Sequence, residues 1–422
     1  MNNKEISIFW FRRDLRLEDN HALSLAMKSG LPVLPLFIFD TDIIDSLESD
    51  DPRISFIYEC LENLNNGLSE YGSSLKVVKG EPIKIFKDLT KAYNIREVFA
   101  NKDYEPYAIK RDNEIEQYLK ENGIDFHQTK DQVVFEENEI IKADGNPYTV
   151  FTPYKKKWLN NFSDDFTIEF EYTKNFLQVD IDFPSLEKLG FNRSEIKVVE
   201  YDLSILDIYA EKRDYPEHST THLGPHLRFG TVSVRDIIRR LVDKQDVFLI
   251  ELIWSEFFMQ ILYHFPRVEN ECFRVKYNNL QWRNNEDEFE LWRQGRTGYP
   301  LVDAGMRELN ETGYMHNRVR MVVASFLVKH LLIDWRWGEA YFAEKLLDYE
   351  LSSNNGNWQW AAGTGCDAAP YFRIFNPETQ LKKFDKDLKY VKKWLPELGS
   401  GDYPEPIVDH KFARQRALDV YG

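Results

Sequence analysis

Short apolar runs alternate with amphipathic stretches over the first 130 residues, and this alternation constrains the fold more than any other feature. The runs that predict strands are Ile6–Phe11, Pro32–Phe39, Leu75–Val78 and Glu97–Ala100. The stretches that predict helices are Asn20–Lys28, Pro52–Tyr71, Pro82–Tyr93 and Glu105–Asn122. Short buried strands separated by helices form a parallel sheet with helices on both faces. Residues 1–130 are therefore predicted to form an α/β domain, Rossmann-like but without GxGxxG or a P-loop.

Helical periodicity dominates the second half of the chain. A capping box at Ser233–Asp236 predicts a helix to about Lys244, and further helices are expected at Val247–His264, Tyr314–Ile333 and Trp337–Leu347. Periodicity is poor over 131–199, which is predicted to be an interdomain linker. Residues 200–422 are predicted to form a large all-α domain. Eight of the ten tryptophans lie between Trp254 and Trp394, which suits either a bound flat ligand or an ordinary large helical core.

Charge and cysteine content restrict the partners. The net charge of −16 argues against a generally basic nucleic-acid protein, so DNA binding would need a local basic patch. Three widely spaced cysteines predict neither disulfides nor a cysteine metal site. His218, His222 and His226 are spaced by four, but Gly224-Pro225 interrupts any helix there, so no metal site is expected. No signal peptide and no run of about 18 apolar residues is present, so we expect a cytoplasmic protein without a membrane partner.

Two constellations are compatible with binding a nucleotide or a base. The hydroxyl-rich segment Ser219–Pro225 leads into a Gly-Pro helix start, where hydroxyl and N–H groups can hold a diphosphate. The same segment could be an ordinary helix cap. Glu251 and Trp254 share a helical face, so an acid and an indole could contact a base. Alternatively, Trp254 is an ordinary core residue and Glu251 a neighbouring acid on the surface.

Two further constellations suggest a pocket. One face of a predicted helix carries Asn317, Arg320 and Met321. An amide and a thioether on this face would suit a pocket for a planar heterocycle, but the face could also be an ordinary solvated helix edge. Asp348, Glu350 and the run Ser352–Gly356 predict a turn-rich polar segment inside an apolar domain, hence a bound polar ligand. Arg320 is the candidate partner of Asp348.

Several long motifs in fixed order resemble the photolyase/cryptochrome family over essentially the whole chain. They are Phe9–Leu17, Glu251–Trp254, Thr297–Ala304, Met315–Met321, Asn354–Trp360 and Asp367–Pro377. The likeness is strongest to class I photolyases that repair cyclobutane pyrimidine dimers. It implies an α/β domain followed by a helical FAD-binding domain.

The resemblance implies a cofactor site in the helical domain. The implied FAD contacts are Tyr209, Thr220, Thr221, His222, Leu223, Gly224, Phe248, Arg320, Asp348, Tyr349, Glu350 and Asn354. Arg320 and Asp348 would form an ion pair beside the flavin ring, and Asn354 would face its N5 atom. Trp282, Trp335 and Trp358 match the tryptophan chain that carries electrons to the flavin. Gly224 and Glu350 depart from the family, where serine and aspartate are common, and Phe248 often aligns with a larger or polar group.

The resemblance also implies the substrate and the reaction. The lesion pocket would consist of Glu251, Trp254, Asn317, Met321 and Trp360, which receive a dimer flipped out of DNA. Arg213, Arg318 and Gln380 would contact the DNA strand. Excited reduced FAD would donate an electron to the dimer, and the electron would return after the ring opens. The implied catalytic set is Glu251, Asn317, Asn354, Trp282, Trp335 and Trp358, without a metal.

An antenna chromophore and three rival functions remain open at this point. Tyr107-Ala108 replace the Asn-Glu pair of folate-binding members, so the antenna would be absent, a deazaflavin or a second flavin near Phe9–Arg13, Phe37–Asp40 and Asn101–Glu105. The first rival is a cryptochrome, a light-sensing signalling protein that has the same scaffold but does not repair DNA. A (6-4) photolyase would carry His-His where this chain has His316-Asn317. A flavoprotein oxidoreductase would need a nicotinamide site. DNA access to the pocket suggests a monomer.

Overall fold

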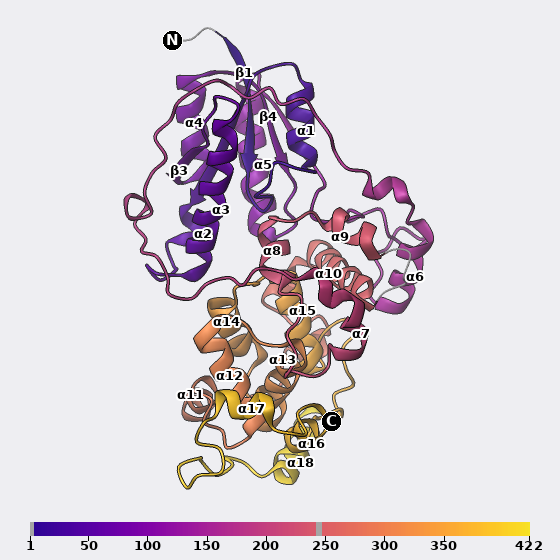
Figure 1. Ribbon diagram of the computed structural model, residues 1–422. Helices are drawn as coiled ribbons and strands as arrows, with labels where there is room; N and C mark the ends of the chain where they lie inside the picture. The colour runs from indigo at the N-terminus through magenta and orange to yellow at the C-terminus, as the bar shows by residue number, and fades with distance from the viewer. Residues whose placement is uncertain (1–3, 242–246) are drawn as a thin grey trace. The chain divides into compact units, whose positions relative to one another are not determined.

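A computed structural model describes residues 4–241 and 247–422, which form two compact units that interleave along the chain (Figure 1). The first unit comprises Met1–Ile140, Trp158–Val199 and Gly224–Gln245. The second comprises Ile141–Lys157, Glu200–Leu223 and Asp246–Gly422. The sequence predicted a domain over 1–130, a linker over 131–199 and a second domain over 200–422, and these boundaries remain predictions.

The first unit contains a five-stranded parallel sheet with strand order β3-β2-β1-β4-β5. The strands are β1 (Glu5–Phe11), β2 (Val33–Asp40), β3 (Lys76–Gly80), β4 (Asn94–Asn101) and β5 (Asp125–Thr129). The predicted parallel sheet and the first four strands are confirmed. Strand β5 was not predicted, because an edge strand with the sequence Asp-Phe-His-Gln-Thr has a single strongly apolar residue.

Helices cover both faces of this sheet. They are α1 (His21–Lys28), α2 (Thr41–Ile44), α3 (Pro52–Ser69), α4 (Pro82–Ala92) and α5 (Pro106–Glu121), with α9 (Val234–Leu241) and two 3-10 turns elsewhere in the unit. Alternate residues of β1 enter two different cores. Phe9 and Phe11 pack in the cluster that contains residues of α1 and α3. Ile8 and Trp10 pack in the cluster that contains residues of α4 and α5. The predicted end of α9 at Lys244 lies outside the described residues.

The second unit is built almost entirely from helices. They include α7 (Tyr209–Lys212), α10 (Val247–His264), α11 (Glu286–Arg293), α12 (Pro300–Thr312), α13 (Asn317–Ser325), α14 (Trp335–Lys345), α15 (Leu351–Ala362), α16 (Pro377–Phe384), α17 (Lys389–Trp394) and α18 (His410–Tyr421). Helix α6 (Phe151–Asn161) begins in this unit, within the stretch predicted to be a linker, and helix α8 (Leu223–Phe229) begins at its boundary. The core gathers residues of α12, α13, α14 and α15 around Trp292, Trp335 and Trp358.

The expected long helix Tyr314–Ile333 is confirmed over most of its length, as α13 continues directly into a π-helical segment, Phe326–Leu331. A second sequence prediction about these helices was wrong. The polar run Ser352–Gly356 is not a turn but lies inside α15. Glu350 stabilises the start of α15, because its carboxylate accepts hydrogen bonds from the N–H groups of Ser352 and Ser353. The polar residues therefore cap and fill a helix instead of breaking one.

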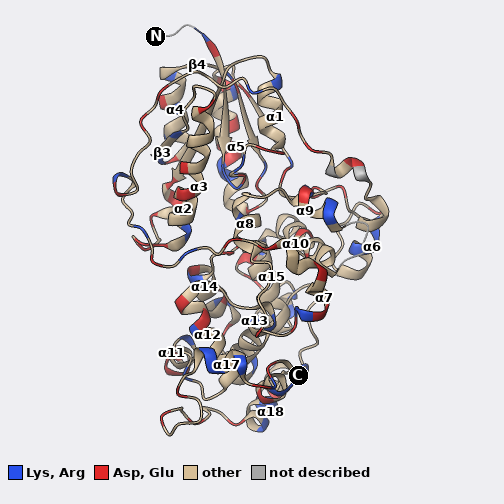
Figure 2. Cartoon of the chain, in the orientation of Figure 1, with Lys and Arg blue, Asp and Glu red and all other residues tan. Residues whose placement is uncertain are grey.

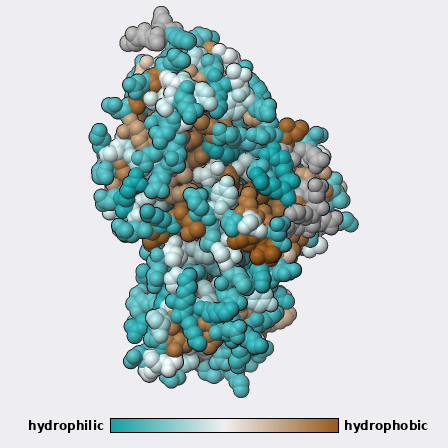
Figure 3. Space-filling model, viewed as in Figure 1, coloured by the Kyte–Doolittle hydropathy of each residue, from teal (hydrophilic) through white to brown (hydrophobic). Residues whose placement is uncertain are grey.

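Helix α10 is the one described helix long and apolar enough, by length and composition alone, to cross a membrane. Its mean hydropathy is 1.3, and half of the segment is buried inside the protein, as in a core helix. Charged residues of both signs occur throughout the chain, including the lysines of α17 (Figure 2). Hydrophilic residues cover most of the face drawn in Figure 3, with hydrophobic areas between them.

Candidate functional site

A pocket of about 600 Å³, counting the space at its open mouth, lies in the second unit. It is lined by α13, α14, α15 and the segment that joins α14 to α15. Nine residues singled out from the sequence line it together: Asn317, Arg320, Met321, Asp348, Tyr349, Glu350, Asn354, Trp358 and Trp360. Because Asn317, Arg320 and Met321 share one face of α13, an amide, a guanidinium and a thioether lie together in one wall of the pocket. Aromatic rings and a second amide come from α15.

Arg320 and Asp348 form a two-pronged ion pair in the wall of this pocket. Nη1 and Nη2 of Arg320 lie 3.1 and 2.9 Å from the two carboxylate oxygens of Asp348, and Nε donates to the Met315 carbonyl at 2.7 Å. The expected pairing is confirmed. Burial acts to lower the pKa of Arg320, but the charge and hydrogen bonds of Asp348, together with the nearby Tyr314 and Glu308, raise it overall. A permanently charged, fixed guanidinium suits contact with an electron-rich ring.

Tyr314 connects this ion pair to the segment predicted to hold a diphosphate. Its hydroxyl is hydrogen-bonded to Thr220 Oγ1 at 2.7 Å, and its ring lies 5.0 Å from the His222 ring. The guanidinium of Arg320 lies 5.9 Å from the centre of the same ring. His222 takes a φ of +51°, a conformation that non-glycine residues rarely adopt and that clusters at ligand sites. Tyr314 was missed because nothing in its sequence context marks it.

Other predicted cofactor contacts lie near this segment. Tyr209 and Phe248 pack edge to face with ring centroids 5.0 Å apart. The side-chain oxygen of Thr221 accepts the N–H of Leu223 at 3.4 Å, and both residues are buried. Gly224 is assigned to the first unit, so its place in the cofactor site stays a prediction.

The three tryptophans of the predicted chain differ in exposure. Trp358 and Trp335 are buried, whereas Trp282 is partly exposed and packs 6.1 Å from the ring of Tyr421. Trp358 contacts Phe342 and Trp292, with ring centroids 5.0 and 6.2 Å away. Gly338 allows α14 to approach Trp358, because a Cβ atom there would lie 2.1 Å from the indole. Electron transfer along the three tryptophans remains a prediction.

Two of the three residues predicted to meet the DNA strand, Arg213 and Arg318, form ion pairs with acidic residues. Arg213 forms an ion pair with Glu251. Burial raises the pKa of Glu251, and the charge of Arg213 opposes this shift. Arg318 pairs with Asp214, and its guanidinium lies 4.4 Å above the ring of Phe384. Phe384 ends α16, the helix that also carries Gln380.

Trp254 has a stacking partner that the sequence did not reveal. Phe151 at the start of α6 lies parallel to its indole, with ring centroids 3.6 Å apart and planes inclined by 10°. The N–H of Phe151 donates to Asp367 Oδ2 at 3.0 Å. One face of Trp254 is therefore covered by the protein itself.

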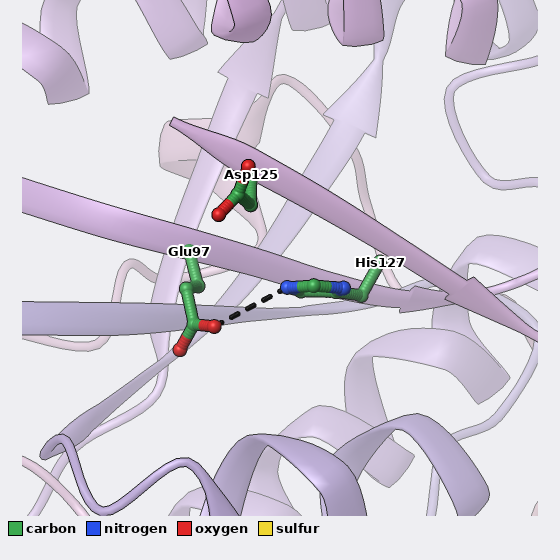
Figure 4. A group of neighbouring side chains, drawn as sticks. All are labelled: Glu97, Asp125 and His127. Atoms are coloured by element: carbon green, nitrogen blue, oxygen red, sulfur yellow. Dashed lines mark hydrogen bonds and ion pairs between the residues drawn. The ribbon is translucent and has the colours of Figure 1, made fainter. Parts of the chain in front are cut away.

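The first unit contains two charged clusters relevant to the sequence predictions. Near the predicted antenna segments, Arg12 and Arg111 both pair with Asp112 and both lie 4.9 Å from the centre of the Trp10 ring. Elsewhere in the sheet, Glu97, Asp125 and His127 lie close enough to hold a metal ion (Figure 4). His127 is hydrogen-bonded to Glu97 at 3.3 Å. Exposed acidic groups of this kind are common without a metal.

The matches to known proteins lie in the photolyase/cryptochrome family, and their subtypes differ. Residues 7–171 match the family model described as DNA photolyase, and residues 248–401 match the FAD binding domain of DNA photolyase. A deoxyribodipyrimidine photo-lyase of Synechococcus sp. is 35% identical, and the alignment covers 98% of this chain and 96% of that protein. Two crystal structures are also similar. The class III photolyase of Agrobacterium tumefaciens has a TM-score of 0.88 at 33% identity, covering 99% of this chain and 97% of that one. The archaeal photolyase of Sulfolobus tokodaii with two FAD molecules has a TM-score of 0.87 at 36% identity, covering 99% of both.

Proposed function

The chain belongs to the DNA photolyase family, and we propose that it splits cyclobutane pyrimidine dimers in DNA by light, with FAD bound in the pocket of the second unit. It is a carbon–carbon lyase of the deoxyribodipyrimidine photo-lyase type, and its helical unit contains an FAD-binding domain. One observation carries the proposal. The pocket wall that holds the Arg320–Asp348 pair and Asn354 also holds Asn317, Met321 and Trp360, so cofactor and lesion residues meet in one cavity.

The residues of the pocket fit a flavin. The ring system is flat and has hydrogen-bonding groups along its edge, and the pocket offers aromatic walls together with amide and guanidinium groups. Thr220 and His222, joined to the pocket through Tyr314, would hold the phosphate end of the cofactor. When bound and reduced, FAD supplies the electron that opens the cyclobutane ring after light absorption. The protein holds the two reactants together and excludes competing reactions.

Glu251 and Trp254 would act on the flipped dimer. Because Phe151 covers one face of Trp254, we infer that a pyrimidine stacks on the opposite face. Trp360 and Met321 would form the remaining apolar walls. Burial raises the pKa of Glu251, so its carboxyl group is more readily protonated and can donate a hydrogen bond to a carbonyl of the dimer.

Local positive charge answers the objection raised by the net charge of −16. Six lysines occur within twelve residues, against two aspartates: Lys382, Lys383, Lys386, Lys389, Lys392 and Lys393. All six are exposed. Arg318 of α13 packs on Phe384, near the start of this stretch, and so joins the lysines to a helix that lines the pocket. We infer that Arg213, Arg318, Gln380 and these lysines contact the DNA backbone.

The rival functions fit less well. A cryptochrome would not need the lesion residues that share the pocket with Asn354. A (6-4) photolyase would need a second histidine at Asn317. His316 is buried, and its ring nitrogen Nδ1 accepts the N–H of Arg318 as a helix cap. An oxidoreductase would need a nicotinamide site, and the sequence has no fingerprint for one. We further propose a class I enzyme that works as a monomer in the cytoplasm without a membrane partner, and an antenna, where one is bound, that is not folate.

The deciding experiment is repair of a dimer-containing thymine oligonucleotide by purified protein with reduced flavin, in blue light and in darkness. We expect light-dependent recovery of the thymine absorbance. Glu251→Ala and Trp254→Ala should slow or abolish recovery while FAD remains bound. Normal FAD binding and photoreduction without any recovery would instead support a cryptochrome.

A further inference from the structure

Asp214, which no sequence pattern marked, is the ion-pair partner of Arg318. Its Oδ1 accepts a hydrogen bond from Nη2 of Arg318 at 2.5 Å. Nη1 of the same guanidinium lies 3.7 Å from the sulfur of Met321, which lines the pocket. Nε is buried and has no hydrogen-bond partner among the residues that the structure describes. The position of the guanidinium therefore depends on its two Nη groups, and Asp214 is the described acid that pairs with them.

We propose that Asp214 is a positioning residue that fixes Arg318 in the place required by the backbone of a flipped-out dimer, and so helps the protein to distinguish damaged from undamaged DNA. This inference rests on the proposed function, because it requires a dimer in the pocket and a phosphate at Arg318. An arginine side chain has several rotatable bonds, and ordering it on binding costs free energy. A side chain that a neighbour has already ordered avoids that cost. The benefit is confined to DNA whose phosphate arrives where the guanidinium is held.

Phe384 and Tyr215 complete the enclosure of Arg318. The guanidinium carbon lies 4.4 Å from the centre of the Phe384 ring. The Tyr215 ring packs edge to face against the same phenylalanine, with 6.3 Å between the ring centroids. Because Tyr215 follows Asp214 in the chain, one short segment both pairs with the arginine and supports the ring on which it lies. The side chain of Arg318 is 16% exposed, so these neighbours leave its guanidinium little room to move.

Ion pairs also anchor the segment around Asp214 to helices of the second unit. Arg213 pairs with Glu251 of α10, and Glu217 lies 2.7 Å from the amino group of Lys389 in α17. Main-chain hydrogen bonds close successive turns within the segment. The carboxylate of Asp214 therefore belongs to an anchored stretch of chain, and it can hold the guanidinium in one place.

A competing role for Asp214 would have the opposite effect on binding. A carboxylate that competes with phosphate for Arg318 would weaken the binding of DNA, so its removal would increase affinity. The contacts favour positioning. Asp214 bonds to one end of the guanidinium only, and an arginine carries several N–H donors, so donors remain for a phosphate.

The test is a double-mutant cycle on Asp214 and Arg318. Fluorescence anisotropy in darkness would compare a duplex that contains one thymine dimer with the same duplex without it. Asp214→Ala should raise the Kd for the damaged duplex about 2–10-fold and leave the Kd for the undamaged duplex nearly unchanged. Asp214→Asn keeps an acceptor without the charge, so its effect should be smaller. In the Arg318→Ala background, Asp214→Ala should have no further effect.

Glu211→Ala is the matched control, because it removes an exposed acid from α7, next to the same segment. It should shift the Kd for both duplexes equally. The same loss from Asp214→Ala with and without Arg318, or tighter binding of the damaged duplex, would overturn the role of Asp214. FAD content reports whether each variant folds. If Asp214→Ala binds no FAD, Asp214→Asn decides, since a wild-type Kd for the damaged duplex would contradict the inference.

The outcomes separate this inference from the proposed function. A wild type that binds both duplexes equally would refute the proposed function, and the role of Asp214 with it. A wild type that prefers the damaged duplex, combined with additive effects of Asp214→Ala and Arg318→Ala, would refute the role of Asp214 alone.

Discussion

Phe151 lies flat against Trp254, with 3.6 Å between the ring centroids. The two residues come from helices α6 and α10, and Asp367 holds the first of them through its main-chain N–H. Trp254 also contacts Phe258, at 5.4 Å between ring centroids, and Phe258 packs on Gly356 of α15. The indole is thus packed against two phenylalanine rings, and our proposal puts a pyrimidine on the face opposite Phe151.

Removing the ring of Phe151 that stacks on Trp254 should weaken recognition of the dimer. Stacked aromatic pairs contribute about 0.5–1.5 kcal/mol beyond burial, so we expect Phe151→Ala to raise the Kd for dimer-containing DNA about 2–10-fold. Phe151→Leu, which keeps apolar bulk, should have a smaller effect. Fluorescence anisotropy with damaged and undamaged oligonucleotides measures both. An equal loss of affinity for both DNAs would mean that Phe151 does not act through Trp254.

Gly338 should be essential for the contact between α14 and Trp358. A Cβ atom would lie 2.1 Å from Cη2 of Trp358 and 2.6 Å from Cδ2 of Leu327, and both side chains are buried in the core. Gly338→Ala should therefore destabilise the protein by about 1–3 kcal/mol, although alanine normally favours a helix by about 1 kcal/mol. Gly401→Ala is the control, because nothing lies within 4 Å of the added atom. Urea unfolding of both variants checks the difference, and equal stabilities would contradict the prediction.

The lysines around α16 should bind DNA without regard to damage. Lys382→Gln/Lys383→Gln removes two exposed charges next to Phe384, on which Arg318 packs. Each lost phosphate contact should reduce the slope of log K against log salt by about 0.9. Affinity should fall equally for damaged and undamaged duplexes. Lys91→Gln, in the first unit, is the control. A loss confined to damaged DNA would place these lysines in lesion recognition instead.

The sequence correctly predicted the features of the fold and the pocket that depend on local residue spacing and on burial. The central strands of a parallel sheet are buried on both faces, so β1 and β2 are continuous apolar runs. The polar edge strand β5 lacks such a run. The spacing of Asn317, Arg320 and Met321 placed them on one face of α13, and they do line one pocket.

Contacts between distant segments could not be predicted in this way. Asn355 belongs to the polar run Ser352–Gly356 that favoured a turn, yet its Nδ2 donates to the Val268 carbonyl at 2.8 Å, far away in the chain. Tertiary partners of this kind override composition. Phe151 and Tyr314 were missed for the same reason.

The cap of α13 should make the pocket sensitive to acid. His316 is buried and neutral, its Nδ1 accepts the N–H of Arg318, and burial together with the charges of Arg320 and Arg318 lowers its pKa to about 4. An unfolded histidine has a pKa near 6.5, so the unfolded chain binds the proton more readily. The contribution of His316 to stability is therefore complete above pH 6.5 and declines as the pH falls from 6.5 to about 4.

His316→Asn isolates this contribution, because asparagine is a good helix cap that does not titrate. The free energy of unfolding in urea, measured between pH 7.5 and 4.5, should fall more steeply for the wild type than for the variant. The difference should open below pH 6.5, where protonation turns an acceptor at Nδ1 into a donor that cannot cap. FAD retention on a desalting column should follow the same order, since α13 carries Arg320. Parallel stability curves would show that His316 is protonated equally easily in the folded and unfolded chains.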